Sequence, residues 1–161
     1  MAGSEYLNES SRYRIGRNLR AASLGVFLVL VGVFLIVYPL VAEIRAFLSD
    51  LSFVPLFDQV YYPAPTSPHP LFYHILRNFF IAWSVWLGVL TIVQLATKGR
   101  ARRVAHTLGD CVFWIGAAYL LDRIGLGALA FGSFLALLVV VAGVSLIIRA
   151  LTMLSLDKLR Y

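Results

Sequence analysis

Four long apolar segments divide the chain, and each is long enough, or nearly so, to cross a membrane. They are residues 21–42, 79–97, 104–121 and 124–148, and the last contains no charged residue. Crossing the hydrocarbon layer as a helix requires roughly 20 predominantly apolar residues. The pattern predicts an all-α integral membrane protein, a single membrane domain in which four transmembrane helices form a bundle.

The basic residues predict the orientation of these helices. Eleven of the 14 Lys and Arg residues lie before the first segment, between the second and third, or after the fourth. Lys and Arg concentrate in cytoplasmic loops. We therefore expect residues 1–20 to be a basic cytoplasmic arm and residues 149–161 a basic cytoplasmic tail of a protein integral to a cell membrane. A three-helix arrangement without 104–121 would put the tail on the other side, so the charges support this shortest segment.

Residues 43–78, between the first two segments, are expected to form an ordered loop on the outer side. Ile44, Phe47 and Leu48 recur at helical spacing, and Pro55 is expected to end that helix. The second half holds four of the six prolines and is expected to be extended. The loop can be a cap over the helices or a docking surface for another subunit. The candidate interface residues are Phe53, Phe57, Tyr61, Tyr62, His69, Tyr73 and His74.

Asp110 is the polar residue of greatest interest, because a carboxylate inside a membrane span is costly and is a functional hypothesis by default. Arg103, His106 and Asp110 lie on one stripe of the third helix. The favoured interpretation is a structural ion pair of Asp110 with Arg103, His106 or an arginine before the first helix. The alternative is a proton or ion path, since histidine titrates near neutral pH.

Small residues recur at spacings that let helices approach closely. The predicted packing positions are Gly25 and Gly32 on the first helix, Gly109 and Gly116 on the third, and Ala128 and Gly132 on the fourth. Ser84, Thr91 and Gln94 are expected to form hydrogen bonds between helices. The pair Asp122-Arg123 is expected to be the tight turn between the third and fourth segments.

Composition supports the membrane assignment and excludes several other classes. The chain has 161 residues, 60% of them apolar and 14% charged, whereas soluble domains average about 25% charged. The net charge of +6 arises from basic residues that flank the apolar segments and set the orientation of the helices, so no nucleic-acid partner is expected. The single cysteine, Cys111, excludes an intrachain disulfide and a zinc site built from cysteines. His69 and His74 have no clustered Cys or carboxylate, so no metal site is predicted. The few Asn, Gln and Cys residues lean towards a thermophilic prokaryotic source.

The sequence contains no phosphate-binding loop, no GxSxG and no HExxH, so no catalytic residue is predicted, and no cofactor is implied beyond bound lipid. The leading hypothesis is a small accessory or structural subunit of a larger membrane assembly, or a self-associating one. Its partners would be membrane lipids and other membrane subunits. One alternative is a transporter or channel component whose path between protomers is lined by Asp110 and His106. A further alternative is a membrane redox or lipid-linked enzyme subunit that uses His69 and His74.

Overall fold

The computed structural model describes residues 21–57, 60–97 and 101–158. Its elements are a first helix, Ala21–Val37, followed by α2 (Leu40–Ser49), β1 (Leu51–Phe57), β2 (Val60–Pro65), α3 (Pro70–Ala96), α4 (Ala101–Gly125) and α5 (Phe131–Lys158). The chain is therefore mostly helical, with one β-hairpin that the all-α expectation omitted. Among the described residues, three helices are long and apolar enough to cross a membrane, or four if the first helix and α2 together count as one bent span.

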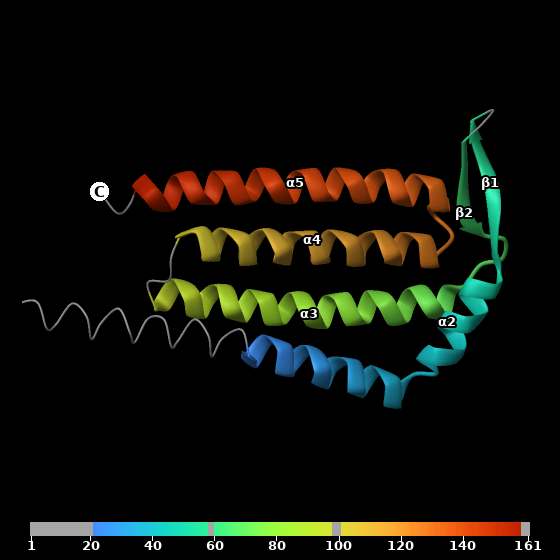
Figure 1. Cartoon of the computed structure of the whole chain (residues 1–161), viewed down its shortest axis with the longest axis horizontal. Coiled ribbons are helices and arrows are strands. Elements are labelled where there is room, and N and C mark those ends of the chain that lie inside the picture. The colour runs from blue at the N-terminus through green and yellow to red at the C-terminus, as the bar shows by residue number, and fades with distance from the viewer. Residues whose placement is uncertain (1–20, 58–59, 98–100, 159–161) are drawn as a thin grey trace, which may run out of the picture.

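The long helices lie side by side in an open row (Figure 1). Among the described elements, α4 packs along both α3 and α5, and no comparable contact joins α3 to α5. The first helix packs on α3 through edge-to-face aromatic contacts of Phe27 and Phe34 with Phe79. The sequence predicted a four-helix bundle without specifying which helices pack together, and the structure places them in an open row. Hydropathy does not distinguish lipid-facing from helix-facing apolar residues, so it predicts helices but not how they pack.

The first apolar segment is bent rather than straight. Its helix ends at Val37, and α2 continues at an angle of 83° across the end of the row (Figure 1). Pro39 stands at the bend, where it removes an amide donor and disfavours helical geometry in the residue before it. The expected uninterrupted helix over 21–42 is therefore wrong.

The outer loop contains structure that hydropathy did not predict. The helix α2 ends at Ser49, so Pro55 does not terminate it and instead lies within β1. The strands β1 and β2 pair antiparallel, with Val54 opposite Tyr62, and the register shifts just after Pro55. Proline has no amide hydrogen to donate to the ladder, which is consistent with an irregularity at this position.

The connection between α4 and α5 begins with a C-terminal helix cap at Gly127. Asp122 and Arg123 are still helical, and α4 continues to Gly125. Gly127 has φ of 68°, and the amide of Ala128 donates to the carbonyl oxygen of Arg123 at 3.0 Å. This is the hydrogen-bond pattern of a Schellman motif, which a glycine in the left-handed region permits. The predicted turn at Asp122-Arg123 is therefore wrong, and α5 begins only at Phe131.

Gly116 is needed where α4 crosses α5. A Cβ atom at this position would lie 2.6 Å from Cγ1 of Val141 on α5. We expect Gly116→Ala to lower the free energy of unfolding by about 1–3 kcal/mol, because the two helices would have to separate. The measurement is reversible unfolding in mixed micelles followed by circular dichroism. Gly88→Ala is the control, since no described atom lies within 4 Å of its Cβ position. Equal losses for the two variants would contradict the prediction.

Candidate functional site

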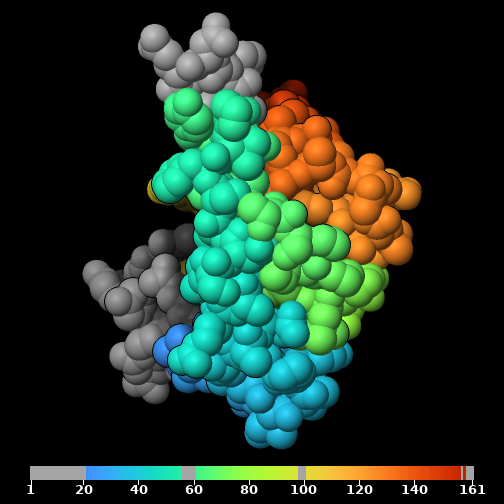
Figure 2. Space-filling view, turned by 90° about the vertical axis from the view of Figure 1, so that its right-hand side faces the viewer, coloured from blue at the N-terminus to red at the C-terminus, as the bar shows by residue number. Residues whose placement is uncertain are grey.

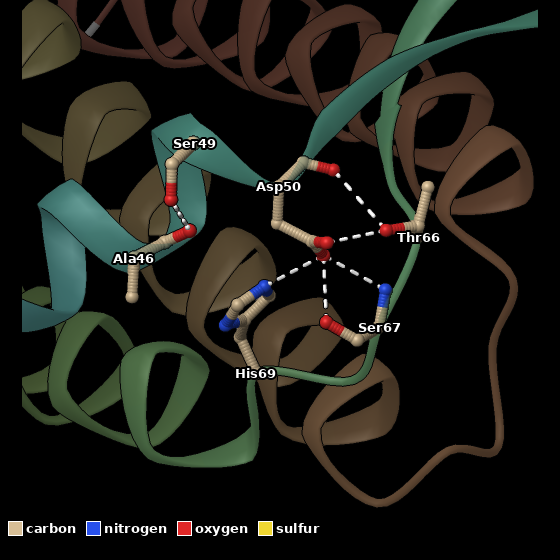
Figure 3. A network of polar contacts seen from close by, with 6 residues as sticks. All are labelled: Ala46, Ser49, Asp50, Thr66, Ser67 and His69. Atoms are coloured by element: carbon tan, nitrogen blue, oxygen red, sulfur yellow. Dashed lines mark hydrogen bonds and ion pairs between the residues drawn. The ribbon is translucent and has the colours of Figure 1, made fainter.

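Asp50 forms the centre of a polar cluster at the base of the hairpin (Figure 3). Its carboxylate accepts hydrogen bonds from the hydroxyl of Thr66, from the amide and hydroxyl of Ser67 at 2.8 and 2.7 Å, and contacts Nε2 of His69 at 3.0 Å. Its carbonyl oxygen also accepts from the amide of Thr66 at 3.2 Å. The cluster, hereafter the Asp50 clamp, joins the end of α2 to the segment between β2 and α3. It therefore closes the hairpin at its base.

The Asp50 clamp is built around a charged carboxylate. The hydrogen bond from Thr66, followed by those from Ser67 and His69, holds the pKa of Asp50 well below its usual range. Hydrogen bonds to the ionised form stabilise that form. The clamp is thus fully formed at neutral pH.

The hairpin has two different faces, because successive side chains of a strand point to opposite sides. Tyr62 and Ala64 are covered, and the hydroxyl of Tyr62 lies against Gly132 near the start of α5. The other face consists of Phe53, Pro55, Tyr61 and Pro63, all exposed, and we name it the outer hairpin face. It contains no charged residue. Phe53 is 76% exposed and Tyr61 60% exposed, which is unusual for residues of this size.

The outer hairpin face points away from the helices. In Figure 1 the hairpin runs across the helix ends and extends past α5, and Figure 2 views this end of the molecule with the hairpin in front. Because Tyr62 faces α5, the alternate residues Phe53 and Tyr61 face the opposite direction. The exposed aromatic rings therefore lie on the end surface of the molecule and not on the sides of the helices.

Aromatic side chains pack α2 against the start of α3, next to the Asp50 clamp. Phe47 of α2 stacks on Phe72 with ring centroids 4.5 Å apart, and it also contacts His69, Tyr73 and Phe131. Tyr73 is itself in the buried core with residues of α4. This packing fixes α2 on the start of α3.

The predicted interface residues therefore separate into two groups. Phe53 and Tyr61 are exposed, whereas Tyr62, His69, Tyr73 and His74 are partly or fully buried and support the hairpin or the helix ends. The side chain of Phe57 lies outside the part of the chain that the structure describes.

Within the helices, Asp110 pairs with Arg149 of α5, Nη2 to Oδ1 at 2.5 Å. The stem of Arg149 lies across Gly109, where a Cβ atom would clash with Cγ of the arginine. The expected partners were Arg103, His106 or an arginine before the first helix, and the arginines before residue 21 lie outside the described residues. Sequence reasoning missed Arg149 because it placed that residue in the tail, although α5 continues to Lys158. A prediction that the fourth helix continues past residue 148 would have placed Arg149 on a helix and suggested it as a partner of Asp110.

Arg103 and His106 make no ion pair or side-chain hydrogen bond within the described part of the chain. His106 is exposed and Arg103 half-buried. The side chain of Asp110 is 46% exposed and that of Arg149 25% exposed. The structure thus brings Asp110 to Arg149 and leaves His106, one turn away, facing outward.

Several other polar side chains of the helices form hydrogen bonds close by. The hydroxyl of Thr107 donates to Oε1 of Gln94 at 3.2 Å, which joins α3 and α4 as expected for Gln94. The hydroxyls of Ser84 and Thr91 donate instead to carbonyl oxygens of their own helix. The thiol of Cys111 donates to the carbonyl oxygen of Ser84 at 3.4 Å.

The small residues also separate by location. Gly109 and Gly116 face α5, and Gly132 lies beneath Tyr62. No atom of the described residues lies within 4 Å of the Cβ positions of Gly25 and Gly32. Ala128 is exposed in the turn before α5.

A second ion pair, not anticipated from the sequence, ties the hairpin end of the row together. Nη1 of Arg77 on α3 contacts Oδ1 of Asp122 on α4. The neighbouring Asn78 donates to the hydroxyl of Tyr38, at the end of the first helix, at 3.4 Å. These contacts join the first helix, α3 and α4 near their hairpin ends.

The described residues contain no group of three or more His, Cys, Asp or Glu side chains placed to hold a metal ion. No protein-family model matches the sequence, and neither a curated protein nor a solved structure is significantly similar to it. The outer hairpin face and the Asp110–Arg149 pair are the two features of the geometry that bear on function.

Proposed function

We propose that this chain is an accessory subunit of a larger membrane assembly and that the outer hairpin face docks another subunit outside the membrane. The observation that carries the proposal is the exposure of Phe53 and Tyr61 on an uncharged strand surface. Aromatic residues are enriched in the cores of protein interfaces and supply much of their binding energy.

The direction of the face favours a protein partner over lipid. The face points away from the helix ends, so it lies on the aqueous side when the helices span the membrane. Apolar surface exposed to water is unfavourable in proportion to its area, and contiguous exposed patches commonly mark interaction sites. A partner subunit removes this surface from water.

The Asp50 clamp supports the same role by holding the hairpin in one position. A two-stranded hairpin alone is marginally stable in water. Here the hydrogen bonds of Asp50 close its base, and Phe47 contacts His69 of the Asp50 clamp. A surface that is already ordered loses less conformational freedom on binding, which favours association.

The basic residues support an orientation with both termini in the cytoplasm and the hairpin outside. Arg102 and Arg103 begin α4, and Lys158 ends α5, at the end of the row opposite the hairpin. Basic residues close to helix ends favour the cytoplasmic side.

The pairing of Asp110 favours the accessory role over transport. Its charge is compensated by Arg149, and the polar groups of Gln94 and Thr107 satisfy one another. Within the described residues, the remaining polar side chains do not form a continuous row along the helices. A compensated ion pair joins α4 to α5 and so supports a structural role for Asp110.

Extraction of the protein from native membranes in mild detergent, followed by native mass determination, tests the proposal. We expect the wild-type chain in a complex with at least one other kind of subunit. The double variant Phe53→Ser/Tyr61→Ser is expected to bind that subunit about 10- to 100-fold more weakly, as loss of central aromatic contacts does.

Leu126→Ser is the matched control, because Leu126 is 63% exposed at the same end of the molecule but lies in the α4–α5 turn. It should leave the complex intact. Extraction of the wild-type chain only as copies of itself, or equal weakening by both variants, would overturn the docking proposal.

A further inference from the structure

The Asp110–Arg149 pair lies inside the apolar part of α4 and is incompletely covered. Asp110 is six residues past the start of the uncharged stretch at residue 104, a depth of about 9 Å at 1.5 Å per residue. Its side chain is nevertheless 46% exposed, and only one of its carboxylate oxygens has a hydrogen-bond partner among the described residues. Lipid tails offer no hydrogen bonds, so this face of α4 requires a polar covering.

His106 is the second incompletely covered polar group on the same face. It lies four residues before Asp110, hence on the same stripe and about 6 Å nearer the helix start. It is exposed, and its ring has no hydrogen-bond partner in the described part of the chain. An unpaired imidazole and an unpaired carboxylate oxygen therefore stand one turn apart.

We propose that a second copy of this chain covers this face, with His106 of each copy donating a hydrogen bond to Asp110 of the other. If the two copies are related by a two-fold axis along the membrane normal, a given residue lies at the same depth in the membrane in both copies. In such an interface, residue i contacts residue j and residue j contacts residue i. The 6 Å difference in depth is within the reach of the two side chains, so both unpaired groups are satisfied at once.

The open row of helices leaves room for this arrangement. α4 lies between α3 and α5 in a single row. On the two sides of α4 that face neither neighbour, no other described helix covers it. The Arg149–Asp110 pair has no net charge, and a neutral imidazole adds none. The interface therefore buries hydrogen-bonded groups without an uncompensated charge. This surface lies along the helices and is separate from the outer hairpin face, so the two proposals are independent.

The test is a dilution series of fluorescently labelled full-length protein in liposomes, with energy transfer between copies as the readout. We expect transfer from wild-type protein with the concentration dependence of a dimer. His106→Ala should raise the dimer dissociation constant about tenfold or more, because two symmetric hydrogen bonds are lost. Ile115→Ala is the control: Ile115 is 54% exposed and lies nine residues, half a rotation, from His106 on the same helix.

Cysteine cross-linking supplies a second measurement that needs no polar substitution within the pair. In a Cys111→Ala background, Arg103→Cys on the proposed face should form a disulfide-linked dimer on oxidation, and Ile115→Cys should not. A monomeric wild-type protein, equal effects of His106→Ala and Ile115→Ala, or cross-linking through residue 115 alone would overturn the proposal. The variant Phe53→Ser/Tyr61→Ser should leave the dimer unchanged, which separates this result from failure of the docking proposal.

Discussion

Replacing Arg149 by leucine is expected to lower the free energy of unfolding by about 2–3 kcal/mol, because it leaves the carboxylate of Asp110 uncompensated within the helices. The loss is smaller than for a fully enclosed pair, since the side chain of Asp110 remains 46% exposed. Unfolding in mixed micelles, followed by circular dichroism, measures it. Arg102→Leu is the control, because Arg102 is exposed near the same end and makes no ion pair in the described structure.

The double variant Asp110→Leu/Arg149→Leu separates pairing from packing. Replacing both members of a buried ion pair by apolar residues is often neutral or stabilising, whereas removing one member is not. We therefore expect the double variant to regain most of the stability lost by Arg149→Leu. A double variant that is less stable than Arg149→Leu would contradict the view that the pair is structural. The same variant should lose the α4-mediated dimer, because Asp110 no longer accepts the hydrogen bond from His106.

Asp50→Ala is expected to release the hairpin while the long helices remain folded. Thr66, Ser67 and His69 lose their shared acceptor, so the hairpin keeps its strand pairing, the contact of Phe47 with His69 and the contact of Tyr62 with α5. Amide hydrogen exchange in β1 and β2 should accelerate strongly, with little change in α4. Ser49→Ala is the control, because its hydroxyl bonds only within α2. Unchanged exchange in the strands of Asp50→Ala would show that the clamp does not hold the hairpin.

The Asp50 clamp also predicts the direction of a pH effect. The hydrogen bonds lower the pKa of Asp50 in the folded protein, whereas an unperturbed aspartate titrates near 3.9. The stabilising contribution is therefore complete above about pH 4 to 5 and is lost as the pH falls further through the folded-state pKa. Hydrogen exchange of the strands should depend on this acidic range in wild-type protein, and Asp50→Ala should lack that dependence.

The positions of the long apolar segments were predictable from the sequence, because a helix that crosses lipid must be apolar and must have a minimum length. The segment at 104–121 lies within α4, and the segment at 79–97 lies within α3 except for its last residue, Thr97. The charge-free run of α5 lies within the fourth segment. Their ends were less predictable. Helices continue beyond the apolar stretch when capping and local hydrogen bonds allow it, as the Schellman motif at Gly127 shows for α4.

The hairpin and the bend at Pro39 were missed for a different reason. Residues of β1 such as Leu51, Phe53 and Val54 are apolar in a pattern that suits a strand or a buried helix equally well. Pairing with β2 decided between them, and the base of this hairpin is closed by Asp50, which contacts Thr66 and Ser67 from 16 and 17 residues away. A contact of this length in sequence leaves no local signal.

By itself, the sequence determined that the chain is mostly helical and has several helices long and apolar enough to cross a membrane, because the thickness of the lipid layer sets the apolar length that each span needs. It predicted four such spans, whereas the described residues contain three, or four if the bent pair counts as one span. It also identified Asp110 as exceptional, because the cost of a carboxylate in an apolar segment depends only on its neighbours in the chain. Only the tertiary structure decided that the helices form an open row, that Arg149 is the partner of Asp110, and that Phe53 and Tyr61 are presented outward. Those features depend on the relative placement of segments distant in sequence, and an apolar helix carries little information about which of its faces meets lipid and which meets protein.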